Sequence, residues 1–155
     1  HPVPVSNCAR LQSFHEWWDA AGGHVWYVDY TSGVWRIDIQ AGADACLWPG
    51  GPDPDTPRPC HAHADRSGRY LAGDPGTYQW RQGLCRVQFR DTVTGRTVDI
   101  ASRPPAPGQD LYGKYHIHPH PQFCAGDRYI CYTTTALGGV DVAVTPVGQM
   151  QDRLR

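Results

Sequence analysis

The chain has 155 residues, 40% of them hydrophobic and 19% charged, which is typical of one globular domain and unlike a disordered chain. The formal net charge is -1 and the lysines and arginines are scattered singly, which argues against nucleic acid or an anionic membrane as a partner. No apolar run approaches the roughly 20 residues that span a bilayer, and no basic-then-apolar signal sequence opens the chain, so we expect a soluble domain.

Residues 26–39 predict a β-hairpin. Two β-rich runs flank a short turn that contains Gly33, and apolar side chains alternate with polar ones along the second run, as in a half-buried strand. The side chains expected on the buried face of that strand are Trp35, Ile37 and Ile39. The best candidate for a helical pattern, residues 11–20, is short, so the sequence predicts no helix.

Two proline-rich segments, residues 49–59 and 103–108, divide the chain into three modules. Proline removes backbone donors and restricts its neighbours, so these segments are predicted to be loops. Further strands are predicted at residues 84–89, 97–100, 129–133 and 140–145. Aspartates follow several strand runs and are assigned structural roles, namely Asp29, Asp38, Asp74 and Asp99.

Histidine and glycine recur at matching points of the three modules, each time just before a strand-like run. The matching sets are His15 with Gly22, His61 with Gly68, and the His118-Pro119-His120 cluster with Gly126. Such repeats are typical of stacked β-modules, and histidines at matching points would surround one shared axis. The sequence therefore predicts an all-β fold of three propeller blades, at about 10–45, 60–101 and 116–148, with a metal or catalytic site at the centre.

Three blades do not close a ring, so the sequence predicts part of a larger propeller. The chain starts at His1 and its only methionine is Met150, which agrees with that expectation. An isolated part would expose sheet faces and edges that further blades would cover. We therefore expect these residues to fold poorly by themselves.

Four histidines are candidates for a metal site. His118 and His120 are two residues apart and flanked by prolines, so they would leave the same face of an extended backbone. Two imidazoles on one face are a natural half of a transition-metal site, although loop and strand histidines often show this spacing without a metal. His61 and His63 form a second such pair. The repeat favours His61, because it stands where His15 stands in the first module.

His15 is the candidate proton acceptor. Its aromatic neighbours are compatible with a buried, hydrogen-bonded core histidine. The same surroundings would also disfavour the charged imidazolium, which would keep the ring neutral and able to accept a proton. Both interpretations remain open from the residues alone.

The six cysteines show no C-x-x-C spacing, which argues against a zinc ribbon or a thioredoxin-type motif. A disulfide framework is compatible with the count, but we expect reduced thiols. No G-x-S-x-G, P-loop or G-x-G-x-x-G motif occurs, so serine hydrolase and nucleotide-binding functions have no support.

Together these segments resemble the oligogalacturonate lyases, a family of intracellular pectin-degrading β-propeller enzymes. The resemblance rests on Phe14-His15-Glu16-Trp17-Trp18 with Asp19 and Gly22, on Cys60-His61 with Gly68 and Gly73-Asp74, and on His118-Pro119-His120-Pro121 with Phe123 and the strand at 128–133. It spans nearly the whole chain. It implies the later blades of a seven-bladed propeller and a cytoplasmic location, with a periplasmic or secreted one as the alternative.

The resemblance also implies the site. It assigns His61, His118 and His120 as ligands of a divalent metal, typically manganese, and His15 as the base beside it. The family has a glutamine ligand where this chain has Tyr115, a poor neutral ligand, so weaker metal binding, a water ligand or a changed substrate is expected. Tyr115 and His63 remain additional candidates. The substrate-binding arginine of the family has no counterpart here.

The implied activity is metal-dependent β-elimination on an oligosaccharide that contains uronate, with oligogalacturonides as substrate. One alternative is a lyase for another uronate polymer such as ulvan, because Tyr115 departs from the pectin pattern. The other is a TolB-like binding propeller in which the histidines are structural.

Overall fold

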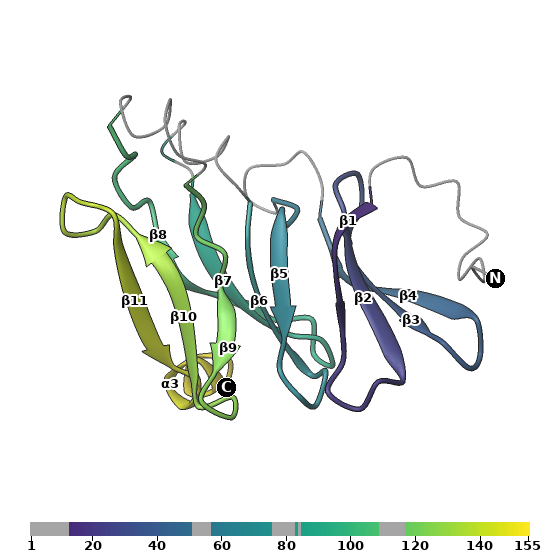
Figure 1. The fold of residues 1–155 in the computed structure, drawn as a ribbon. Helices are drawn as coiled ribbons and strands as arrows, with labels where there is room; N and C mark the ends of the chain where they lie inside the picture. The colour runs from purple at the N-terminus through teal and green to yellow at the C-terminus, as the bar shows by residue number, and fades with distance from the viewer. Residues whose placement is uncertain (1–12, 51–56, 76–82, 84, 109–116) are drawn as a thin grey trace.

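The computed structural model describes residues 13–50, 57–75, 83, 85–108 and 117–155, which form three antiparallel sheets and one short helix (Figure 1). The first sheet contains β1 (Ser13–Trp18), β2 (His24–Asp29), β3 (Gly33–Asp38) and β4 (Ala43–Pro49). The second contains β5 (His61–Ala64), β6 (Tyr70–Asp74), β7 (Arg86–Asp91) and β8 (Thr97–Ser102). The third contains β9 (Gln122–Cys124), β10 (Tyr129–Thr134) and β11 (Asp141–Pro146), followed by α3 (Val147–Arg153). In each sheet, strands adjacent in sequence are adjacent in space.

The repeated glycines occupy matching turns. Gly22, Gly68 and Gly126 follow β1, β5 and β9, and their φ angles are 74°, 69° and 69°. This left-handed region is costly for residues with a Cβ atom, so glycine is favoured at each turn. The histidine-glycine spacing in the sequence therefore marks the end of the first strand of each sheet.

Two apolar layers hold the sheets face to face. Between the first two sheets lie Trp26, Val28, Val34, Trp48, Ala64 and Leu71. Between the second and third sheets, with α3, lie Ala72, Phe89, Phe123, Ile130, Val147, Met150 and Leu154. Successive residues of a strand point to opposite faces, so the neighbours Leu71 and Ala72 join different layers. The second sheet is thus covered on both faces, as expected for the middle one of three stacked modules.

The third sheet leaves an apolar face uncovered. Val142 and Val144 of β11 are 67% and 57% exposed, and they pair across the sheet with Thr133 and Cys131. The opposite face of β10 carries Ile130, which is fully buried in the second apolar layer. One face of this sheet therefore resembles a packed blade, and no other sheet among the described residues covers the opposite face.

Some local predictions were wrong. The one helix among the described residues lies at 147–153, where no helix was predicted, whereas the segment 11–20 contains strand β1, in agreement with the rejection of a helix there. Ile39 is exposed instead of facing the core, because β3 ends at Asp38 and Ile39 lies in the turn that leads to β4. The described part of the chain contains no helix that is long and apolar enough to cross a membrane.

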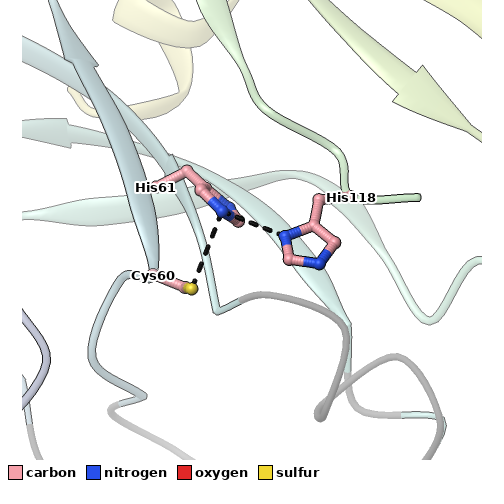
Figure 2. Close-up of side chains that lie close together, drawn as sticks. All are labelled: Cys60, His61 and His118. Atoms are coloured by element: carbon pink, nitrogen blue, oxygen red, sulfur yellow. Dashed lines mark hydrogen bonds between the residues drawn. The ribbon is translucent and has the colours of Figure 1, made fainter. Parts of the chain in front are cut away.

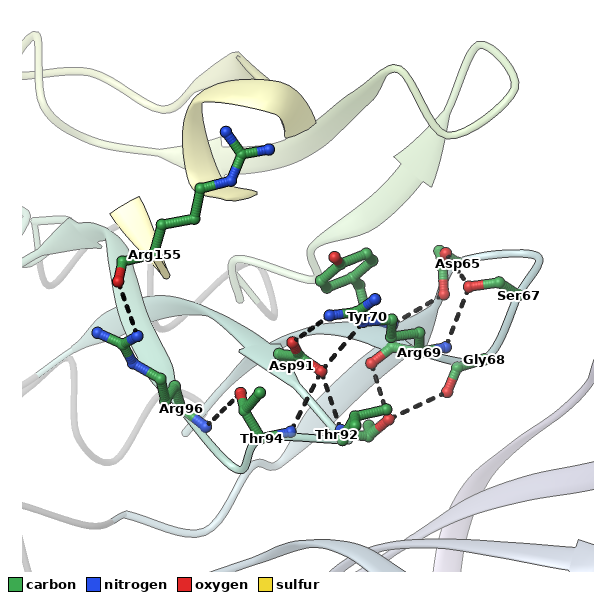
Figure 3. Close-up of polar contacts among 11 residues, drawn as sticks. Asp65, Ser67, Gly68, Arg69, Tyr70, Asp91, Thr92, Thr94, Arg96 and Arg155 are labelled. Atoms are coloured by element: carbon green, nitrogen blue, oxygen red, sulfur yellow. Dashed lines mark hydrogen bonds and ion pairs between the residues drawn. The ribbon is translucent and has the colours of Figure 1, made fainter. Parts of the chain in front are cut away.

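Asp91, the last residue of β7, bonds Arg69, which lies just before β6 in the turn that follows β5 (Figure 3). Its carboxylate accepts hydrogen bonds from the Arg69 guanidinium at 2.9 and 3.3 Å and from the backbone N–H of Val93 at 2.9 Å. The hydrogen bond from Arg69 is the main reason that the pKa of Asp91 falls from 3.8 to about 2. The charged form of Asp91 is therefore favoured in the folded protein.

Replacing Asp91 with asparagine is expected to lower the free energy of unfolding at pH 7 by about 1–2 kcal/mol, because half-exposed Arg69 is partly screened by solvent. The lowered pKa stabilises the fold fully above pH 3.8, and this contribution is lost as the pH falls through about 2. Urea unfolding of the full-length protein at pH 7 and pH 3 should show the difference from wild type shrinking at the lower pH. The control is Asp152→Asn, because the ion pair of Asp152 with Arg155 is largely exposed. A loss of stability in Asp91→Asn that does not depend on pH would contradict this account.

Candidate metal centre

The first strands of the three sheets, β1, β5 and β9, lie next to one another. The Trp17 ring stacks near His63, with 6.2 Å between the ring centroids. The backbone N–H of Phe123 donates to His63 Nδ1 at 3.2 Å. These contacts join the three modules along one line, so side chains from all three can meet there.

Three of the histidines singled out in the sequence, His15, His118 and His120, gather around His61. The centroid of the His61 ring lies 4.7 Å from that of His15, 4.6 Å from that of His118 and 3.8 Å from that of His120. Residues far apart in the sequence are thus brought to one place, as the matching points of the repeat predict. Their assignment as base and ligands stays a prediction.

Asp74 orients His61 from the neighbouring strand. Asp74 pairs with His61 across β5 and β6, and its carboxylate oxygens lie 3.0 and 3.1 Å from His61 Nδ1. The same carboxylate accepts the backbone N–H of His120 at 2.9 Å. Sequence analysis gives Asp74 a structural role only, whereas the structure places it, buried, in the site. A carboxylate on one imidazole nitrogen directs the other toward a ligand.

His61 Nε2 therefore faces the remaining members of a cluster (Figure 2). It lies 3.0 Å from His118 Nδ1 and 3.7 Å from Cys60 Sγ. The three donor atoms of Cys60, His61 and His118 all lie within 4.8 Å of one another. Burial opposes the charged form of His61, but its bonds to Asp74 and Cys60 outweigh this effect and raise its pKa to about 9.

Cys60 is a site residue that sequence analysis missed. Adjacent residues of a regular strand point to opposite faces, so Cys60 and His61 would not be expected to share a site. The chain bends at Cys60, and β5 begins only at His61. The bend allows both side chains to turn toward His118. The Cys60-His61 pair was visible in the sequence, but the bend was not.

His15 lies at the edge of this cluster in an unusual backbone conformation. The register of β1 and β2 is interrupted between Phe14 and Trp17, and His15 has a φ of 56° there. His120 has a φ of 44°. Left-handed conformations are uncommon outside glycine and are concentrated at functional sites. Two of the four clustered histidines thus hold strained backbone.

Tyr30 lies beside both His15 and Cys60. Its hydroxyl is 2.7 Å from His15 Nε2. Burial, and then the neighbouring Cys60, raise the pKa of Tyr30 well above its ordinary value, so the phenol keeps its proton. Desolvation, followed by the nearby His61, lowers the pKa of His15 and favours its neutral form.

Two candidates remain. His63 packs between Trp17 and Phe123 and is absent from the set formed by Cys60, His61 and His118. Tyr115 lies outside the described residues. A cleft of about 200 Å³ opens beside the cluster, and its walls include His15, His61, His63 and His120. These imidazoles therefore border a space that a small molecule can enter.

Comparisons with known proteins identify the architecture. A solved structure of oligogalacturonate lyase in complex with manganese superposes with a TM-score of 0.69 at 19% identity, over 92% of this chain and 37% of that one. The oligogalacturonate lyase of Vibrio parahaemolyticus gives 0.65 at 16%, over 92% and 38%. TolB of Acinetobacter baumannii gives 0.62 at 8%, over 89% and 30%. The fold is that of β-propeller blades.

The described sheets correspond to part of a propeller, since the chain spans little more than a third of the length of either lyase. No family model matches the chain. No curated protein matches its sequence. At these low identities the likeness concerns the fold alone, so activity must be argued from the site.

Proposed function

We propose that this chain provides the catalytic part of a metal-dependent lyase that cleaves oligosaccharides containing uronate, with oligogalacturonides as the first candidate substrate. The observation that carries the proposal is the meeting of four imidazoles from all three blades beside an open cleft. Its architecture is shared with oligogalacturonate lyase in complex with manganese. The proposed cofactor is accordingly a divalent metal held by His61, His118 and His120, whose ring lies next to that of His61.

β-Elimination on a uronate removes a proton from the carbon next to the carboxylate. A second negative charge would build up there, so the reaction needs positive charge at the carboxylate. A bound divalent cation supplies that charge. The donor set fits such an ion, because His61 is oriented by Asp74 and its Nε2 faces His118. The proton itself must go to a neutral base beside the substrate.

Hydrogen bonding indicates which nitrogen of His15 could act as that base. The Tyr30 hydroxyl has one hydrogen, which it cannot donate to both Cys60 and His15. In the proposed arrangement His15 Nε2, 2.7 Å from the Tyr30 hydroxyl, donates to the Tyr30 oxygen, so the neutral ring carries its lone pair on Nδ1. In this arrangement Nδ1 accepts the substrate proton, and Tyr30 is a positioning residue that keeps the tautomer in place.

Tyr30→Phe is expected to lower kcat of the full-length protein by about threefold to tenfold and to leave KM nearly unchanged. The substitution keeps the ring that packs on Phe14 but removes one hydrogen bond, which is worth about 0.5–1.5 kcal/mol. Steady-state kinetics on oligogalacturonides would measure both constants. Unchanged kcat, or a change in KM alone, would show that Tyr30 does not position His15.

In the proposed reaction the C5 proton goes to His15 and the C4–O glycosidic bond breaks, so that the 4-linked sugar leaves and its oxygen takes up a proton from water. The C4–C5 double bond that remains is conjugated to the uronate carboxylate and absorbs in the ultraviolet. Oligogalacturonides and ulvan oligosaccharides should be incubated with the full-length protein after dialysis against a chelator, with and without added manganese or zinc. We expect metal-dependent absorbance with at least one uronate, and the preferred uronate would identify the substrate class. No product from either substrate with either metal would reject the lyase proposal.

A binding propeller is the second candidate, because TolB structures superpose over most of the chain. In that case the histidines would be structural, and the cleft would hold a peptide or a partner protein. A product assay and metal analysis distinguish the two functions. A TolB-like protein would form no unsaturated product, and His118→Ala would leave its metal content unaltered.

A further inference from the structure

We propose that Cys60 Sγ is a ligand beside His61 Nε2 and His118 Nδ1, and that the centre therefore takes a thiophilic divalent cation, zinc in the first place. This inference deepens the proposed function, since it concerns the metal of the same site. It does not depend on lyase activity, because metal binding is measured separately.

The spacing of the donor atoms agrees with a tetrahedral ion. A zinc ion binds imidazole nitrogen at about 2.0–2.1 Å and thiolate sulfur at about 2.3 Å. Tetrahedral angles then separate two nitrogens by about 3.4 Å, and a nitrogen from a sulfur by about 3.6 Å. The structure has 3.0 Å between His61 Nε2 and His118 Nδ1 and 3.7 Å between His61 Nε2 and Cys60 Sγ. For these two pairs the observed distances differ from those expected around an ion by about 0.4 and 0.1 Å. The third pair, His118 Nδ1 and Cys60 Sγ, lies within 4.8 Å, so it would close by at most about 1.2 Å around an ion.

The surroundings also favour a metal at these atoms. The Asp74 carboxylate bonds His61 Nδ1, the ring nitrogen opposite the proposed ligand atom Nε2. Imidazoles that bind a metal through one nitrogen typically bond a carboxylate or carbonyl through the other. His61 and His118 are buried, and Cys60 is partly buried, so a bound ion would be shielded from bulk water.

Ligand chemistry decides the class of metal. Manganese is a hard ion that suits carboxylate, carbonyl and water oxygens, whereas cysteine sulfur selects softer ions such as zinc. Two imidazoles without sulfur would accept either ion. Cys60 therefore changes the expected cofactor from manganese to a thiophilic metal, a conclusion that the histidines alone do not give.

The experiment compares full-length wild type, Cys60→Ser and the control Cys46→Ser, whose cysteine lies on β4 in the first sheet. Zinc binds most sites more tightly than manganese, so preference alone is not diagnostic. Isothermal titration of the metal-free proteins should show that Cys60→Ser weakens zinc binding by at least roughly 10–100-fold, the loss usually seen when a residue hydrogen bonded to a metal ligand is replaced. Manganese binding should change much less. Cobalt-loaded wild type should show a sulfur-to-metal charge-transfer band that Cys60→Ser lacks.

Zinc affinity unchanged in Cys60→Ser, or no cobalt-sulfur band in wild type, would overturn the assignment of Cys60. Equal losses for both cysteine variants would do the same, because the effect would then be unspecific. Failure of the lyase proposal is distinguishable: it would appear as zinc bound through Cys60 without any unsaturated product. Conversely, manganese-dependent turnover that is indifferent to Cys60→Ser would keep the lyase and reject the thiolate ligand.

Discussion

His15→Ala in the full-length protein is expected to lower kcat on oligogalacturonides by about 10²–10⁴-fold, the usual contribution of a general base. Desolvation lowers the pKa of His15, so its neutral form is available to accept a proton near neutral pH. Its ring lies 4.7 Å from that of His61 but outside the Cys60, His61 and His118 donor set. Metal content of the variant should therefore equal that of wild type.

The matched control is His24→Ala, because His24 of β2 forms its hydrogen bond with Asp19 at 2.7 Å, away from the cluster. Its kcat is expected to stay within about twofold of wild type. Progress curves of ultraviolet absorbance, with metal analysis of each protein, measure both properties. Retention of activity by His15→Ala within about tenfold would remove this residue from the base role.

Trp26→Ala is expected to destabilise the protein by about 3–5 kcal/mol, the range for removal of a buried aromatic side chain. Trp26 is 0% exposed and lies between the first two sheets. Its ring stacks on Trp17 at 5.8 Å, and the Arg36 guanidinium lies 5.4 Å from its centroid. The substitution would leave a cavity between two blades, and Trp17 also carries the contact from β1 to β5. Urea unfolding of the full-length protein would give the free energy.

Trp18→Ala serves as the comparison, since Trp18 follows Trp17 on β1 and its side chain is 63% exposed. Its substitution should change the free energy of unfolding by less than about 1 kcal/mol. Comparable losses for the two tryptophans would show that the interface between the first two sheets does not carry the stability attributed to it.

The repeated modules could be predicted from the sequence because local chemistry marks them. Glycine at a left-handed turn after the first strand of each sheet leaves a spacing that is visible without a structure, as at Gly22 and Gly68. The hairpin at 26–39 follows from alternation along its strands. The meeting of His15, His61, His118 and His120 follows from that repeat, since matching points of stacked blades surround one axis.

Other features depend on the tertiary structure. The bend that turns Cys60 toward His118 and the pairing that places Asp74 behind His61 both come from long-range packing, which a single sequence does not reveal. The helix at 147–153 was missed because its amphipathic pattern is short; Val147 and Met150 are buried only because the third sheet and α3 pack against the second. The end of β3 at Asp38, which leaves Ile39 exposed in the following turn, is likewise set by the pairing of the strands.

The most direct measurement is a crystal structure of the full-length protein grown with zinc and recorded at the zinc absorption edge. Our account predicts one anomalous peak between the first strands of the three sheets, within bonding distance of Cys60 Sγ, His61 Nε2 and His118 Nδ1. An ion bound elsewhere, or these side chains still bonded only to one another at saturating zinc, would contradict it.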